Sequence, residues 1–439
     1  MENEKFFRQY HLEDAWRQIR DVLFNQTTGM VYDYVTSRDY DSRFDHLPSS
    51  EEIAKRFPNP CGWGTGMEDC ALNGGILLDL MCFPGCEDSV FSAKIAEGVI
   101  LCGSVHGRRG FIARGISPRD GKSCYVNSSR DQFTLATYGM WKFLRGCLPS
   151  SIRKEGTEFL RSVADYCEKT VTPEHHYNLL RLDGKPALVS SLWNCAPHET
   201  MRLPMIYGIA WDVSGEKHYS ELMNRYAEAG LKRTLALSPE SELWDMPLLQ
   251  MQLSLNFFLE NGMLPGLREE IRQSMYTAAL IAQRQLKKLL QQAESFSGGW
   301  GELYDNWRNL PMRIEKSPDD GAEIENGLNP VFRHGYACPN MFLRGIGNYL
   351  AVMAHSRDFL LPEQFVNRAD RLIRKIDFMK AAGNGTIALV YGYGALSSYG
   401  KLSGMNPCGE QMAHEIKETS EPESEIQSHN KSCIRSSIK

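Results

Sequence analysis

The sequence predicts an all-α fold, an (α/α)6 barrel in which six helical hairpins form two concentric rings, with long loops and a small β-hairpin at the active-site end. The distribution of charge along the chain favours this fold. Six segments with few charges alternate along the chain with six that are charged on one face. A helix that is apolar all round is buried, whereas one with a polar face lies at a surface. The alternation therefore predicts an inner ring of helices wrapped by an outer ring.

The inner helices are expected to begin near six positions, namely Glu68, Ser129, His198, Asp245, Asn340 and Thr386. The outer helices are expected over residues 4–24, 89–103, 151–170, 216–235, 267–292 and 363–382. Connections from an inner helix to the next outer helix are short, whereas most return connections are long (25–67, 103–128, 171–197 and 297–339). The long loops should therefore gather where the inner helices begin, and one of them carries an Asp-Gly-Lys turn that predicts a β-hairpin within 171–197.

Composition limits the classes of function. Residues 1–405 are expected to form one catalytic domain, and the polar segment 406–439, poor in aromatic residues, to be disordered. The net charge of -5 gives no general affinity for nucleic acid or for an anionic membrane. No apolar run is long enough to span a bilayer, and the charged, amphipathic start does not resemble a secretory leader. We therefore expect a cytoplasmic protein, or a periplasmic one if a leader was removed; its oligomeric state is open.

Acidic and polar residues stand at the predicted starts of the inner helices. They include Glu68 with Asp69, Arg130 with Asp131, His198 with Glu199, and Trp244 with Asp245. Helix capping alone would select several of these residues, so each has a purely structural interpretation. Their convergence on one cavity instead favours a pocket with paired carboxylates, which is the equipment for cleaving a glycosidic bond. That chemistry needs neither a metal nor an organic cofactor, and the scattered cysteines show no paired zinc-knuckle spacing.

The long loops supply groups suited to a sugar. Residues 103–128 carry five basic side chains in a glycine-rich frame, among them Arg114, and a guanidinium can hold a carboxylate in a bidentate fork. The alternative is a solvated basic loop. Trp300 and His334 give the loop 297–339 flat faces for stacking on sugar rings, and Trp63 precedes an inner helix. These aromatic residues could instead pin their loops to the barrel.

Two segments carry a resemblance to a known family. The stretch GMEDCALNGG resembles the Asp-Cys-x-x-Asn segment of unsaturated glucuronyl hydrolases, and NSSRDQFTLATYG resembles their later Thr-Arg-Gly-Gln segment. These enzymes and the related rhamnogalacturonyl hydrolases are six-hairpin glycoside hydrolases with an (α/α)6 barrel. The resemblance implies that Asp69 is the general acid/base, followed one turn later by Asn73, and that Arg130 and Gln132 match the second segment. The family Gly between those two residues is Asp131 here, which adds a second carboxylate.

The interpretation is a glycoside hydrolase that removes a terminal uronic acid from an oligosaccharide or glycan. Asp69 is the expected proton donor, with Asp131 or Glu68 as the partner that activates water or stabilises positive charge. Arg114 and Arg130 would hold the sugar carboxylate. The remaining predicted contacts are hydroxyl binding by Gln132, His198, Glu199 and Asp245, aromatic stacking by Trp63, Trp244 and Trp300, and a substrate-binding role for His334.

Three alternatives remain open. A sugar epimerase on the same barrel would use histidines such as His198 and His334 as acid and base. A non-catalytic toroid would bind a glycan or a protein without chemistry. A polysaccharide lyase on a related toroid would need a Tyr or His base beside an Asn or Arg that neutralises the substrate carboxylate.

Overall fold

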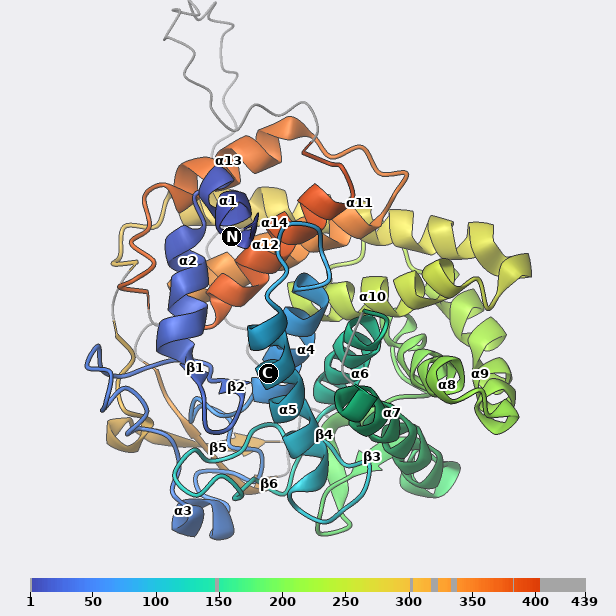
Figure 1. The fold of residues 1–439 in the computed structure, drawn as a ribbon, viewed down its shortest axis with the longest axis horizontal. Helices are drawn as coiled ribbons and strands as arrows, with labels where there is room; N and C mark the ends of the chain where they lie inside the picture. The colour runs from blue at the N-terminus through green and yellow to red at the C-terminus, as the bar shows by residue number, and fades with distance from the viewer. Residues whose placement is uncertain are drawn as a thin grey trace, which may run out of the picture.

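A computed structural model describes residues 2–146, 150–300, 303–316, 323–332, 338–381 and 383–402. In this part of the chain the fold is the predicted (α/α)6 barrel (Figure 1). The inner ring consists of α4 (Cys70–Leu80), α6 (Arg130–Leu144), α8 (Arg202–Ser214), α10 (Asp245–Asn261), α12 (Cys338–His355) and α14 (Gly385–Ser398). The predicted tail 406–439 and His334 lie outside the described residues.

The outer ring follows the prediction with two differences. It consists of α5 (Ser89–Ser104), α7 (Ser150–Thr170), α9 (Lys217–Leu235), α11 (Arg268–Glu294), α13 (Glu363–Ile373) and the N-terminal group α1 (Glu2–Gln9), α2 (Glu13–Arg17) and η1 (Gln18–Leu23). The N-terminal helix breaks at His11, whose φ of 55° is left-handed. The last outer helix stops at Ile373 and gives way to turns before residue 382.

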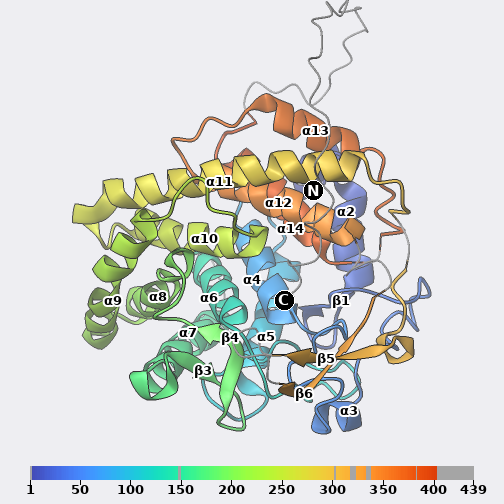
Figure 2. The same cartoon turned by 180° about the vertical axis from the view of Figure 1, so that it is seen from behind.

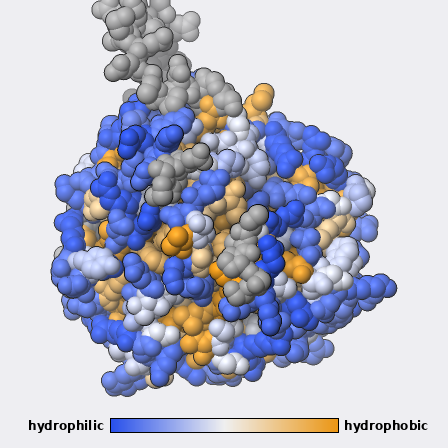
Figure 3. Space-filling model, viewed as in Figure 1, coloured by the Kyte–Doolittle hydropathy of each residue, from blue (hydrophilic) through white to orange (hydrophobic). Residues whose placement is uncertain are grey.

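The inner ring closes on itself. Each inner helix packs against the next along the chain, and α14 packs back against α4. The inner helices are buried on nearly all sides, as their lack of charge requires, whereas the outer helices are amphipathic. Figure 3 shows one face of the molecule as largely hydrophilic, with apolar side chains in small separate groups.

The irregular segments gather on one side of the helical rings. The hairpins β3 (Asn178–Leu180)–β4 (Pro186–Ser191) and β5 (Met312–Lys316)–β6 (Glu323–Pro330) lie on that side with α3 (Ser50–Ala54) (Figures 1 and 2). The first hairpin confirms the prediction from Asp-Gly-Lys. The second was not predicted, and neither was the short pair β1 (Phe24–Asn25)–β2 (Met30–Val31).

Glycines let neighbouring inner helices approach backbone to backbone. A Cβ added to Gly75 of α4 would lie 2.1 Å from the carbonyl oxygen of Leu135 in α6, and one added to Gly139 would lie 1.9 Å from that of Gly75. The pair α12 and α14 repeats the arrangement, since a Cβ on Gly347 would lie 2.1 Å from the Ala388 carbonyl oxygen. The ring is therefore tightest at these two crossings, on either side of the α4–α14 contact.

Adjacent glycines of α4 provide a test. Gly75→Ala should lower the free energy of unfolding by about 2–3 kcal/mol, because the new methyl meets backbone that cannot move aside. Gly74→Ala meets a methyl of Val99 at 2.7 Å instead, and this side chain can shift. The gain of about 1 kcal/mol in helix propensity should offset most of its cost. Urea unfolding of both variants checks this, and equal losses would contradict it.

Candidate functional site

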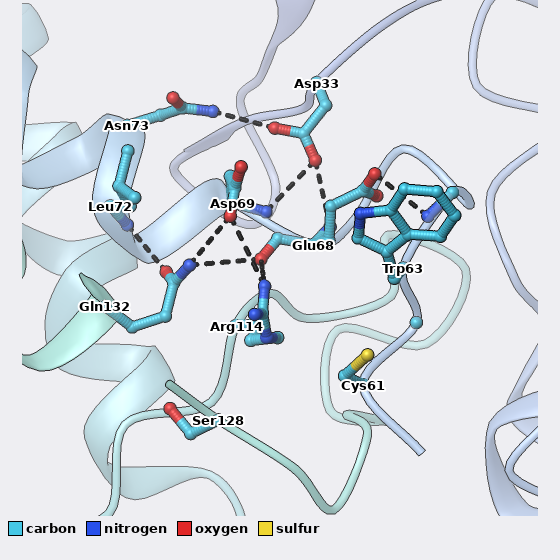
Figure 4. Close-up of polar contacts among 12 residues, drawn as sticks. Asp33, Cys61, Trp63, Glu68, Asp69, Leu72, Asn73, Arg114, Ser128 and Gln132 are labelled. Atoms are coloured by element: carbon cyan, nitrogen blue, oxygen red, sulfur yellow. Dashed lines mark hydrogen bonds and ion pairs between the residues drawn. The ribbon is translucent and has the colours of Figure 1, made fainter. Parts of the chain in front are cut away.

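Asp69 stands at the N-cap position of α4, yet its carboxylate does not cap the helix. No hydrogen bond joins its side chain to the first turn of α4. Instead its Oδ1 accepts a hydrogen bond from Gln132 Nε2 at 3.0 Å and lies 3.4 Å from Arg114 Nη1. The side chain remains 31% exposed. The structural interpretation of this residue as a cap is thus ruled out, and its carboxylate is held by side chains from two other segments (Figure 4).

The turn before α4 is held in place by a carboxylate that the sequence analysis did not single out. Asp33 is buried, and its Oδ2 accepts hydrogen bonds from the backbone N–H groups of Glu68 at 2.9 Å and Asp69 at 3.0 Å. Its Oδ1 accepts from Asn73 Nδ2 at 3.0 Å and Asn384 Nδ2 at 2.8 Å. Asp33 therefore joins the starts of α4 and α14 and fixes the backbone of Asp69.

Glu68 serves the same turn. It is buried, and its two carboxyl oxygens accept hydrogen bonds from the backbone N–H groups of Gly64 at 3.0 Å and Gly66 at 2.8 Å. Both glycines have positive φ, 83° and 90°, so they supply a loop conformation that other residues rarely adopt. The predicted alternative, Glu68 as a catalytic partner, would have to compete with these backbone bonds.

Gln132 and Arg114 approach Asp69 together. Gln132 is fully buried, accepts from Leu72 N–H at 2.9 Å and donates to the Glu68 carbonyl at 3.1 Å as well as to Asp69. Arg114 Nη1 donates to the same Glu68 carbonyl at 2.8 Å. The starts of α4 and α6 are thus cross-linked around one carboxylate, as Figure 4 shows.

Burial dominates the electrostatics of Asp69. Loss of hydration raises the pKa of its carboxyl above the ordinary value, and the negative charge of Asp131 adds to the rise. The charges of Arg114 and Arg344 and the Gln132 hydrogen bond oppose it without reversing it. A carboxyl with a raised pKa retains its proton at higher pH and can act as a general acid.

Asp69 opens into a cavity of about 740 Å³. Its walls come from the turn at Trp63–Asp69, the segment Glu242–Asp245, the outer helix α11, the hairpin β5–β6 and the first half of α12. Trp63 lines it, as predicted from its place before an inner helix, and Trp244 lines it too. Trp300 does not line it, since its ring packs against Phe296 and Phe342 at centroid distances of 5.6 and 6.0 Å.

A second charged group occupies the starts of α6 and α8. Arg202 is fully buried, and its Nη1 lies 3.1 Å from Asp131 Oδ1. Arg130 forms an ion pair with the buried Glu199, and His198 Nε2 lies 3.7 Å from the same carboxylate. Asp131 stays 30% exposed. Four residues predicted for the site, Arg130, Asp131, His198 and Glu199, therefore lie together with Arg202. This group lies beside Asp69, and none of its members lines the cavity.

Arg344 is the most informative residue that the sequence analysis missed. It lines the cavity, and its Nε lies 3.2 Å from Asp245 Oδ2, which also accepts from Asn348 Nδ2 at 2.8 Å. The buried carboxylate of Asp245 holds Arg344 in the wall and also lines the cavity, so its predicted role in binding hydroxyls stays a prediction. Arg202 and Arg344 share a signal that could have identified both: each is the single arginine of an inner helix with few charges.

The described residues hold neither a metal-binding cluster nor a membrane-spanning helix. No cluster of His, Cys, Asp and Glu suitable for a metal ion occurs in that part of the chain. None of its helices has the length and apolar character needed to cross a membrane.

Asp33→Ala tests the anchor of the turn. Four donors would lose their acceptor in a buried site, so the free energy of unfolding should fall by about 3–5 kcal/mol. Asp41→Ala, an exposed carboxylate in the same loop, should change it by less than about 0.5 kcal/mol. Thermal and urea unfolding measure both, and a small effect of Asp33→Ala would show that the turn does not depend on it.

Comparison with known proteins gives a likeness in structure and none in sequence. No protein-family profile matches this sequence, and no curated protein is similar to it. Among solved structures, the chain resembles the crystal structure of a sugar epimerase from a ruminal bacterium, with 10% sequence identity and a TM-score of 0.44. The match covers 85% of this chain and 86% of that one. No family is assigned at this level of similarity.

Proposed function

We propose that this protein is a glycoside hydrolase that releases a terminal uronic acid from a glycan, with Asp69 as the proton donor. The observation that carries the proposal is the state of Asp69: a carboxyl with a raised pKa, open to a cavity, held by Gln132 and Arg114 and not used as a helix cap. Protonation of a leaving glycosidic oxygen requires such a group.

Asp131 is the proposed partner. It follows Arg130 at the start of α6, and the adjacent Gln132 touches Asp69, so the two carboxylates stand at the same end of the ring. In the reaction Asp69 gives its proton to the leaving oxygen while the bond from that oxygen to the anomeric carbon breaks. Water adds to the anomeric carbon, and Asp131 takes the proton that the water loses. The Arg202 guanidinium offsets the charge of Asp131.

The sugar carboxylate is assigned to Arg344, with Arg313 nearby. Both arginines line the cavity. The two arginines predicted for this role do not line the cavity: Arg114 donates to the Glu68 carbonyl and Arg130 pairs with Glu199. Asp245 holds the guanidinium of Arg344, and the positive charge of Arg344 lowers the pKa of Asp69. This arrangement supports a sugar ring bound between Arg344 and Asp69. Arginine suits this task because its planar fork matches a carboxylate.

Asp69→Asn tests the assignment. Loss of a general acid should reduce hydrolysis of aryl glucuronides, galacturonides or unsaturated uronides by about 10²–10⁴-fold, measured by release of new reducing ends. The matched control is Asp79→Asn, a buried carboxylate at the other end of α4. An epimerase would give no new reducing ends. Full activity of Asp69→Asn would rule out Asp69 as the proton donor.

The pH profile provides an independent test. A general acid must be protonated, so kcat/KM should fall as the pH rises through the pKa of Asp69. Arg114 lowers that pKa, and Arg114→Met should therefore move the alkaline limb to higher pH. Arg109→Met, an exposed arginine of the same loop paired with Glu158, should leave it in place. A shift to lower pH in Arg114→Met would contradict the assignment.

A further inference from the structure

The cavity continues well beyond Asp69, across the rim of the barrel. Its far wall includes Gln285, Leu289 and Gln292, which belong to the outer helix α11. The volume of about 740 Å³ falls within the range of roughly 300–1,000 Å³ typical of pockets for drug-sized ligands. A pocket for a single terminal sugar would need only the part near Asp69 and Arg344.

The segment 241–244, which lies against α11 at this wall, is held in place by neighbouring side chains. Tyr349 of α12 donates its hydroxyl to the Leu243 carbonyl at 3.3 Å. Two side chains of α11 hold the same segment: Lys288 pairs with Glu242 at 2.6 Å, and Arg284 donates to the Ser241 carbonyl at 2.6 Å. The segment 241–244 is thus tied to two helices, and the surface it presents to the cavity is preorganised.

Trp244 is the exposed aromatic residue of this wall. Its side chain lines the cavity and is 58% exposed, at the N-cap of α10, where it makes no capping bond. A large aromatic ring held in water at a pocket is typical of a binding position, because it provides a wide apolar face at low entropic cost. Gln285 and Gln292 supply amide donors and acceptors beside it, suited to hydroxyl groups.

We propose that Trp244, Gln285 and Gln292 form a subsite for a second, neutral sugar, joined to the uronide through the bond that Asp69 cleaves. The order of the residues along the cavity supports this assignment. Arg344 contacts Asp245, the residue that follows Trp244, and the charge of Arg344 also acts on Asp69. The substrate is then an oligosaccharide with a uronic acid at its end, and a simple glycoside of small leaving group is bound less well. This inference rests on the proposed function.

Binding to Asp69→Asn separates the subsite from the chemistry. Calorimetry compares free glucuronate and galacturonate with disaccharides in which each is linked to a neutral sugar. Trp244→Ala, introduced into the Asp69→Asn variant, should weaken disaccharide binding by about tenfold and leave monosaccharide binding unchanged. Trp244→Phe should restore most of the affinity. The matched control is Tyr276→Ala, which removes another exposed aromatic ring from the surface of α11, away from the cavity.

The outcomes distinguish the two proposals. An equal loss for mono- and disaccharides, no loss, or no binding to any sugar of the panel would overturn the subsite. If Trp244→Ala selectively weakens disaccharide binding while Asp69→Asn retains full hydrolytic activity, the subsite stands and the proposed role of Asp69 fails. Since Trp244 is largely exposed, its replacement should leave the circular dichroism spectrum and the unfolding midpoint unchanged.

Discussion

The site depends on two backbone N–H groups that point at a buried carboxylate. The amides of Glu68 and Asp69 both donate to Asp33, and the same carboxylate receives the side-chain amides of Asn73 and Asn384. An inner helix would ordinarily use a side chain of its own to satisfy its first amides. Asp33 fixes the turn before α4, while the first amides of the helix itself are satisfied from two other segments: Ala71 N–H donates to the Arg114 carbonyl at 3.0 Å and Leu72 N–H to Gln132 Oε1 at 2.9 Å. The side chain of Asp69 is therefore not needed as a cap. The fold thereby places a reactive carboxyl, that of Asp69, at the start of α4 while the first amides of the helix keep their acceptors.

Arginines flank both carboxylates of the proposed pair. Loss of hydration raises the pKa of Asp69, and the charges of Arg114 and Arg344 restrain that rise. Arg202 faces Asp131 from a fully buried position. Two carboxylates at neighbouring helix starts thus stand in different surroundings. The glycine contacts between α4 and α6 set the spacing of those starts.

The ring architecture was predictable because burial leaves a direct trace in the sequence. Inner helices such as α4 and α14 carry almost no charge, and outer helices such as α7 and α13 carry it on one face. The β3–β4 hairpin was predictable from its turn. The β5–β6 hairpin was missed although the sequence carries a similar signal: Met312 and Ile314 alternate with polar residues along β5, and Asp320-Gly321 follows in the sequence. The starts of α4 and α6 were correctly paired, as the contact of Gln132 with Asp69 shows.

The partners of the site residues were less accessible to sequence reasoning. Asp33 lies in a loop with Asp39 and Asp41, and nothing in the composition distinguishes the buried carboxylate from the exposed ones. The roles of Arg114 and Arg130 depended on which acceptor each would reach, and neither a basic loop nor a helix start encodes that choice. Arg202 and Arg344 were visible as single arginines in buried helices, where a charge requires a partner. Such residues are the best sequence signal for a site of this type.

The most direct test of the account is a crystal structure of Asp69→Asn with a uronate-terminated disaccharide. The account predicts the glycosidic oxygen within about 2.6–3.2 Å of the side chain at position 69. It also predicts the uronate carboxylate on Arg344 and the second sugar over Trp244. A disaccharide bound with its glycosidic oxygen away from position 69, or outside the cavity, would contradict it.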